Sequence, residues 1–227
     1  VKRHDMDWRF NTIWFDKIEN NLLFSKDYKK NQLLSNNDNP FNSEYFIFWY
    51  MKEKNLNDLI DYKNIKYLEL NSSSLKNFEI FQNIQTIKRL DLHYCTKLLT
   101  DFGISKLKNS LQILHVNQSK KFTFKTELIE LKNLKVLSLN NCGEIENLDF
   151  LENLPDLIDF RFVNTNIKSG DLNPIIKHKK IKSVGFLNKR HYSHKTEEIE
   201  KILNEKKTDL KIINEFKDDF FTFRYDF

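Results

Sequence analysis

A short apolar pattern returns six times in this chain, at intervals of 22 to 24 residues. Each copy opens with an isoleucine or leucine and runs into a short segment in which apolar and other residues alternate. The copies begin at Ile65, Ile87, Leu111, Leu134, Leu157 and Ile181. One such unit cannot bury its own apolar face, so a regular repeat of this length predicts units stacked side by side with one strand each.

Two inward apolar residues flank one outward residue in each copy, which is the two-residue period of a strand. The pairs are Leu68 and Leu70, Leu90 and Leu92, Leu114 and Val116, Leu137 and Leu139, Phe160 and Phe162, and Val184 and Phe186. Beyond the strand the apolar spacing becomes three and four, which predicts a helical or 3₁₀ return segment. Small residues able to hydrogen-bond the turning backbone follow five strands, namely Ser73, Cys95, Ser119, Cys142 and Thr165. Lys189 breaks this pattern and indicates that the array is ending.

Residues 65 to about 189 resemble the leucine-rich repeat family, in particular its short irregular class of phosphatase regulators and bacterial internalins. The resemblance implies an α/β solenoid. A curved parallel sheet of about eight strands would form the concave face, and short helices or 3₁₀ turns would form the convex face. It also implies binding of another protein by the concave sheet, without catalysis and without a cofactor.

The flanking segments are predicted to be caps. The chain then divides into a cap over residues 1–44, a repeat array over 45–195 and a second cap over 196–227, within one continuous domain. Phe46 and Phe48 fit the inward places of an atypical opening strand. Before that strand, the apolar segments 9–15 and 21–25 are expected to pair as a hairpin, and the polar stretch 26–40 is expected to be a loop.

The second cap is predicted to begin with a helix that has Thr196 at its N-cap. Leu210 and Ile212 would then take the inward positions of a last strand. The tail from Asp218 onward is too aromatic to remain free in water, so we expect it to cover the far end of the array.

Outward residues of neighbouring strands stand side by side, so they form columns across the predicted sheet. The columns are aromatic and charged near the first strands, and Tyr, Trp and Arg are frequent among the residues that dominate protein interfaces. The predicted partner-binding residues are Trp49, Tyr67, Glu69, Arg89, Asp91, His93, Tyr94, His115 and Arg161. An alternative places Tyr45 and Trp49 under the first cap as ordinary core.

Histidines beside acidic residues raise the question of catalysis or metal binding. Asp91 and His115 would lie about 5 Å apart on adjacent strands. No nucleophile, oxyanion donor or cleft accompanies them, so a cross-strand polar pair is the favoured interpretation. His191 and His194 lack the further ligands of a metal site. With only 4 Gly in the chain there is no glycine-rich phosphate cradle.

Cys95 and Cys142 occupy equivalent positions in two repeats that are separated by a third. Their strands would lie about 10 Å apart, beyond the roughly 7 Å between Cα atoms that a disulfide allows. We therefore expect buried free thiols, which suit a cytoplasmic location.

Composition narrows the class of protein. Hydrophobic residues make up 40% of the chain, with 20 Phe, so the chain should fold. No apolar run approaches the roughly 18 residues of a membrane span, and no secretion signal is evident. The net charge is +5, and basic residues gather from position 167 to 211. That bias indicates either a solvated end or an anion-binding surface.

The sequence thus leaves three functional hypotheses. The first is a monomeric bacterial immunity-type protein that neutralises a partner toxin, because the lysine-, asparagine- and isoleucine-rich composition resembles that of an AT-rich bacterial genome. The second is a targeting adaptor for another protein. The third, and less favoured, is a nucleic-acid-binding module that uses the basic C-terminal half.

Overall fold

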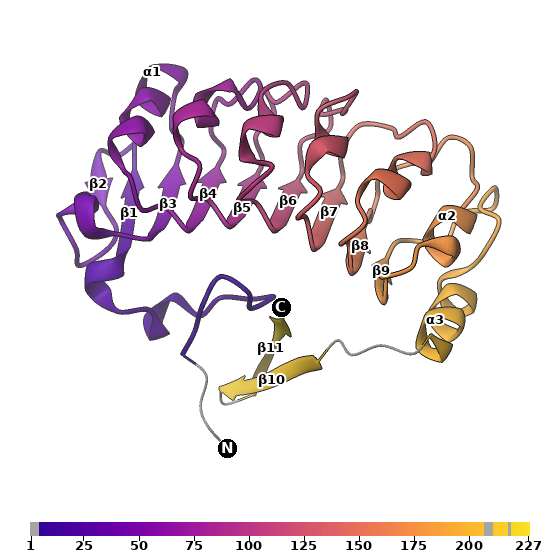
Figure 1. Ribbon diagram of the computed structural model, residues 1–227. Helices are drawn as coiled ribbons and strands as arrows, with labels where there is room; N and C mark the ends of the chain where they lie inside the picture. Colours follow the sequence, from indigo (N-terminus) through magenta and orange to yellow (C-terminus); the bar gives the residue numbers. More distant parts are fainter. Residues whose placement is uncertain (1–4, 207–210, 218) are drawn as a thin grey trace.

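The computed structural model describes residues 5–206, 211–217 and 219–227 as a curved stack of repeats (Figure 1). In this part of the chain, a mostly parallel sheet of nine strands lines the inner side of the curve, in the order β2-β1-β3-β4-β5-β6-β7-β8-β9. The strands are β1 (Leu23–Asp27), β2 (Gln32–Leu33), β3 (Tyr45–Trp49), β4 (Tyr67–Asn71), β5 (Arg89–His93), β6 (Ile113–Asn117), β7 (Val136–Asn140), β8 (Asp159–Arg161) and β9 (Ser183–Gly185). The predicted α/β solenoid is confirmed.

The strand register is the one that the repeat predicts. Leu68 pairs with Leu90, and the same row continues through Leu114, Leu137, Phe160 and Val184. These inward residues are buried in one continuous core, and Leu137 is 0% exposed. Each repeat therefore covers the apolar edge of its neighbours, as the stacking argument requires.

The convex side consists of short return segments. They are α1 (Glu53–Leu56), η4 (Asn57–Asp61), η5 (Glu79–Asn83), η6 (Ile104–Leu107), η7 (Leu128–Glu130), η8 (Asp149–Asn153) and α2 (Asn173–Lys177), where η denotes a 3₁₀ helix. Small residues between strand and return segment bond the backbone of neighbouring repeats: Ser73 Oγ accepts from Met51 N at 3.1 Å, and Thr165 Oγ1 accepts from Cys142 N at 2.9 Å. Both thiols are free, as expected, and Cys95 is buried, whereas Cys142 is half-buried rather than buried.

The opening of the array differs from the prediction. Segments 9–15 and 21–25 do not pair as a hairpin, because β1 instead extends the sheet parallel to β3. Its antiparallel partner β2 lies inside the stretch expected to be a loop. The remaining 3₁₀ segments, η1 (Phe15–Lys17), η2 (Asn20–Leu22) and η3 (Pro40–Asn42), lie around these two strands. Parallel pairing lets Phe24 join the core beside Phe46 and Phe48.

The end of the chain also differs. Helix α3 (Thr196–Glu205) forms, but Thr196 is its first residue, and Lys195 N donates to Glu198 Oε2 at 2.7 Å. A strand forms where the last strand of the array was expected, but its place in the array is wrong: β10 (Lys211–Lys217) pairs antiparallel with β11 (Phe220–Asp226) in a separate sheet. Leu210, expected inward on that strand, lies outside the described residues. Among the described helices, none has the length and apolar character needed to cross a membrane.

The aromatic tail does not cover the far end of the array. Instead, the β10–β11 hairpin and residues 6–15 lie together across the inner side of the curve (Figure 1). Phe10 and Arg224 form an antiparallel bridge, and Asn11 N donates to Phe223 O at 2.8 Å. We call residues 6–15 together with β10 and β11 the strap. Phe223 and Tyr225 of β11 pack against the outward apolar residues Ile113 of β6 and Val136 of β7. Removal of these side chains from water stabilises the strap in this position.

Candidate functional site: the concave face

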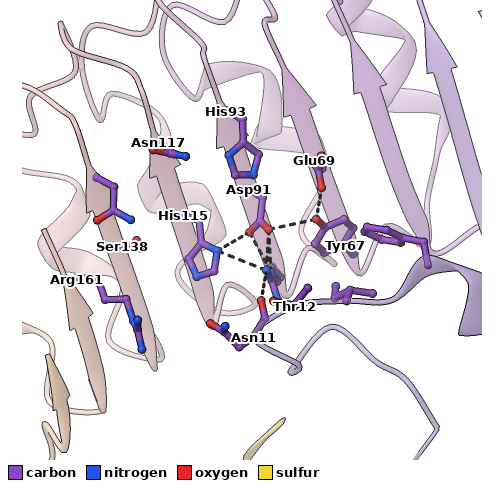
Figure 2. Close-up of a pocket in the computed structure, with 14 residues that line it drawn as sticks. Asn11, Thr12, Tyr67, Glu69, Asp91, His93, His115, Asn117, Ser138 and Arg161 are labelled. Carbon is purple, nitrogen blue, oxygen red and sulfur yellow. Dashed lines mark hydrogen bonds and ion pairs between the residues drawn. The ribbon is translucent and has the colours of Figure 1, made fainter. Parts of the chain in front are cut away.

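The concave face carries a hollow of about 370 Å³ between the sheet and the strap (Figure 2). Its floor consists of outward residues of β4 to β8, and residues of the strap close one side. The lining residues are Asn11, Thr12, Ile13, Phe15, Tyr67, Glu69, Arg89, Asp91, His93, His115, Asn117, Ser138, Asn140 and Arg161. Most of the predicted partner-binding residues thus gather in one place.

A buried ion pair lies at the centre of this floor. Arg89 donates to both carboxylate oxygens of Asp91, from Nε at 2.9 Å and from Nη2 at 2.8 Å. The two side chains are 5% and 4% exposed. Burial by itself would raise the pKa of Asp91, but the Arg89 guanidinium, with help from His115, holds that pKa well below its usual range. Asp91 is therefore a fixed anion rather than a proton acceptor at neutral pH.

Tyr67 and His115 complete a network around Asp91 (Figure 2). The Tyr67 hydroxyl lies 2.5 Å from Glu69 Oε2 and 3.2 Å from Asp91 Oδ2. Burial, and then the charges of Asp91 and Glu69, raise the pKa of Tyr67 well above its usual value, so its phenol stays protonated. His115 Nδ1 lies 3.3 Å from Asp91 Oδ1.

The two carboxylates of this network already accept hydrogen bonds from Arg89, Tyr67 and Asn71. Ligand atoms of Glu69, Asp91 and His93 lie within 4.8 Å of one another, a spacing that could hold a cation. The Arg89 guanidinium already occupies both oxygens of Asp91, however, and its charge repels a metal ion. Because Asp91 is locked by Arg89 and Tyr67 keeps its proton, the arrangement fits structural support better than acid–base chemistry.

The same arginine binds the strap. Arg89 Nη1 donates to the carbonyls of Phe10 and, at 3.3 Å, of Trp8, and Nη2 donates to Asn11 O at 3.2 Å. One guanidinium thus joins a buried carboxylate on the sheet to three backbone carbonyls of the strap. This use of several donors in a fixed plane is a property of arginine that lysine lacks.

A second contact lies three strands away, at Asp159 on β8. The Tyr225 hydroxyl donates to Asp159 Oδ2 at 2.5 Å, and Arg161 Nη2 donates to the same oxygen at 3.1 Å. Burial, and then the charge of Asp159, raise the pKa of Tyr225, so this phenol also remains a donor. The Tyr225 ring packs on outward Ile113 and Val136, which are both 0% exposed.

Exposure divides the nine predicted residues. Trp49 and Tyr94 are exposed, at 37% and 56%, and Glu69, His93, His115 and Arg161 are half-buried. The expectation that Tyr67, Arg89 and Asp91 lie open to a partner is wrong, since they are 1%, 4% and 3% exposed. The strap covers them, which the column argument did not include. Of the two residues alternatively assigned to core, Tyr45 is buried and Trp49 is not.

Sequence reasoning missed Asp159, Tyr225 and the strap itself. Two signals were present. Ile113 and Val136 are apolar although they occupy the outward column, which indicates that something covers them. Phe221, Phe223 and Tyr225 alternate with a period of two, which is the pattern of a strand with one aromatic face rather than of a terminal plug.

Some basic side chains of the C-terminal half have local partners. Lys168 pairs with Glu146 at 3.0 Å, and Lys180 pairs with Asp156 at 2.5 Å. Lys206 Nζ donates to the backbone of His178. Ion pairs of the kind that Lys168 and Lys180 make are typical of a solvated surface, and these two pairs give nucleic-acid binding no support.

Comparison with known proteins supports the fold. No protein-family model and no curated protein matches the sequence. Among solved structures, internalin C2 from Listeria monocytogenes is similar, with 23% identity and a TM-score of 0.53 over 68% of each chain. An internalin (inlF) from the same organism has 13% identity and a TM-score of 0.32 over 66% of this chain and 64% of that chain. The repeat register and the first of these likenesses show that the protein has a leucine-rich repeat fold, similar to that of internalin C2.

Proposed function

We propose that the protein is a non-catalytic module that binds another protein along the open margin of its concave face. The observation that carries the proposal is the exposure of Trp49, at the end of β3, and of Tyr94, directly after β5. Rigid aromatic side chains contribute much of the binding energy at protein interfaces. Half-buried His93 lies in the same row as Trp49, two strands away, and adds a polar contact.

Backbone conformation supports the choice of this margin. The residue directly after each of the five strands β3 to β7 has a positive φ, and these residues include Tyr50 at 55° and Tyr94 at 55°. Asn141 and Asn164 occupy the same place in later repeats, and asparagine tolerates this conformation better than tyrosine does. An aromatic residue in a conformation that disfavours it, and left exposed, is a feature that often marks a functional surface.

The nine predicted residues then have two different roles. Trp49, Tyr94 and His93, with Glu69, His115 and Arg161 deeper in the hollow, are proposed to contact the partner. The buried Tyr67, Arg89 and Asp91 are proposed to hold the face and the strap in place. The surface so defined is mixed in charge and aromatic at one end, which is typical of transient protein interfaces.

In its finer form, the proposal is that the partner is a toxin and that the protein is a monomeric, cytoplasmic immunity-type inhibitor. The composition typical of an AT-rich bacterial genome supports this role. The two free thiols suit a reducing compartment. A targeting adaptor is the other form of the same binding function.

Capture from native lysate at moderate salt tests the proposal. Wild-type protein, a Trp49→Ala/Tyr94→Ala double variant and a Phe102→Ala control would serve as baits. Phe102 is also an exposed aromatic, at 51%, but it lies in the turn before η6, outside the strands of the sheet. A partner retained by the wild type and the control, and reduced at least tenfold with the double variant, supports the proposal. Equal retention by all three baits, or loss of retention with modest added salt alone, contradicts it.

A further inference from the structure

The strap covers a part of the concave face that the array itself does not require to be covered. Outward residues Tyr67, Ile113 and Val136 make no contribution to the inward core between sheet and return segments. Their burial comes from the strap: Met6, Phe10 and Ile13 pack with Tyr67, and Tyr225 packs with Ile113, Val136 and Ile158. This covered surface joins apolar area to two charged anchors, Arg89 and Asp159.

The strap is bonded to itself more than to the sheet. Its segments are joined by backbone bonds, such as Tyr225 N to Arg9 O at 3.2 Å, and by the Arg224–Asp7 ion pair at 3.0 Å. Among the described residues, no backbone hydrogen bond joins the strap to β4 through β9. The strap can therefore leave the face as a unit without breaking the ladder of the parallel sheet.

The two anchors, Arg89 and Asp159, bind different chemical groups of the strap. Arg89 binds backbone carbonyls, which any extended segment supplies. Asp159 accepts from a phenol whose ring lies on Ile113 and Val136, so this anchor selects tyrosine. Phenylalanine would keep the ring contacts but would leave the buried Asp159 without that donor.

We propose that the strap is an internal competitor, which occupies and can leave a recognition surface for an extended segment carrying a tyrosine. A partner that presents such a segment would displace the whole strap, which takes β11 off Asp159 and residues 6–15 off Tyr67 and Arg89. It would then gain access to Tyr67, Arg89, Ile113 and Val136. The affinity of an incoming segment is reduced by the small fraction of molecules in which the strap is open. This surface lies under the strap, so the inference goes beyond binding at the Trp49–Tyr94 margin and does not depend on it.

Binding of the strap's own sequence in trans tests the inference without knowledge of the partner. The probe is a fluorescently labelled peptide of residues 219–227, titrated with the full chain and followed by anisotropy. The chains are wild type, Tyr225→Phe, Asp159→Asn and, as a matched control away from the strap, Tyr192→Phe. Tyr192 is half-buried and its hydroxyl bonds the backbone at Ile167 and Thr165.

The two strap variants are expected to act in opposite ways. Tyr225→Phe weakens the internal strap but leaves the acceptor intact, so it should bind the peptide about tenfold more tightly than the wild type. Asp159→Asn also loosens the strap, but it damages the acceptor, so it should bind no more tightly than the wild type. Tyr192→Phe should match the wild type. Equal affinity of Tyr225→Phe and wild type, equal affinity of the two strap variants, or no binding by any chain would overturn the inference.

Hydrogen exchange of the wild-type protein is a second test of whether the strap opens, and it needs no variant. The amides of Asn11 and Tyr225, which bond within the strap, should exchange at least about tenfold faster than the core amides of β6 and β7. They should do so through an opening that leaves the sheet protected. If strap and sheet amides exchange only together, through global unfolding, the strap is a permanent part of the fold and the inference is wrong.

Discussion

Replacement of Arg89 by alanine is expected to destabilise the fold by about 3–5 kcal/mol, because it leaves Asp91 as an unpaired buried charge. The guanidinium donates to both oxygens of that carboxylate at 2.8–3.1 Å, and the two side chains are only 5% and 4% exposed. An ion pair open to solvent contributes only about 0–1 kcal/mol. As an uncovered outward strand residue, Arg89 would belong to this second class, so the measured loss distinguishes the two situations.

Urea unfolding followed by circular dichroism measures the effect. The variants are Arg89→Ala, Asp91→Asn, their combination and an Arg190→Ala control, since Arg190 is exposed. The control should change the free energy of unfolding by less than about 0.5 kcal/mol. The double variant should lose less than the sum of the single losses, because the second change removes the charge that the first leaves uncompensated.

The pH dependence of the free energy of unfolding of Arg89→Ala gives an independent test. In the wild type the pKa of Asp91 lies below its ordinary value of 3.8, so this group contributes stability that is present above pH 3.8 and is lost at lower pH. Without Arg89, burial dominates and should raise the pKa of Asp91 above 3.8. The loss of stability caused by Arg89→Ala would then be largest near neutral pH and would become smaller as the pH falls through the raised pKa of Asp91. A loss below about 1 kcal/mol at pH 7, or strictly additive losses, would refute the reasoning.

Three further outcomes are expected. Leu137→Ala should lower the free energy of unfolding by about 2–5 kcal/mol in the same urea assay by leaving a core cavity, and a loss under about 1 kcal/mol would contradict the register. Burial raises the pKa of Cys95 to about 11 and that of Cys142 to about 12. Both thiols should therefore react slowly with a thiol reagent until urea is added, and rapid labelling of the native protein would contradict this. Burial lowers the pKa of His178 below 6.5, and its Nδ1 accepts backbone hydrogen bonds at 3.1 Å and 3.2 Å. The neutral imidazole should therefore contribute stability in full above pH 6.5, and this contribution should be lost as the pH falls through the lowered pKa. His178→Gln should remove this part of the pH dependence of unfolding, and an unchanged pH profile would contradict the prediction.

The repeat was predictable because its information is local and repeated. Inward Leu137 and Leu139 alternate with outward Ser138 in one copy. The same spacing in five other copies fixes which face is inward and which residues of neighbouring strands are partners. The same logic correctly placed Arg89 beside Tyr67 and Ile113 in one outward column. The repeat pattern gave the position of each side chain on the sheet but not its exposure, because exposure depends on which other segments of the chain lie against that face.

The two ends of the array were harder to predict because they occur once. An apolar segment such as 21–25 can form a hairpin or add a parallel strand with nearly the same local pattern, and only the fit of Phe24 against Phe46 and Phe48 decides between them. The aromatic alternation of β11 indicated a strand, but no spacing rule connects Tyr225 to Asp159, which are 66 positions apart.

The sequence by itself thus determined the solenoid, its register, its inward core and the two free thiols, because each follows from a period or from a distance between repeats. Only the tertiary structure decided which outward residues a partner can reach. Contact between residues 6–15, β10–β11 and the sheet converts Tyr67, Arg89 and Asp91 from surface residues into a buried network, and leaves Trp49 and Tyr94 at the margin. The physical reason is that burial of an outward face depends on segments far away in the chain, whereas strand periodicity depends only on neighbours.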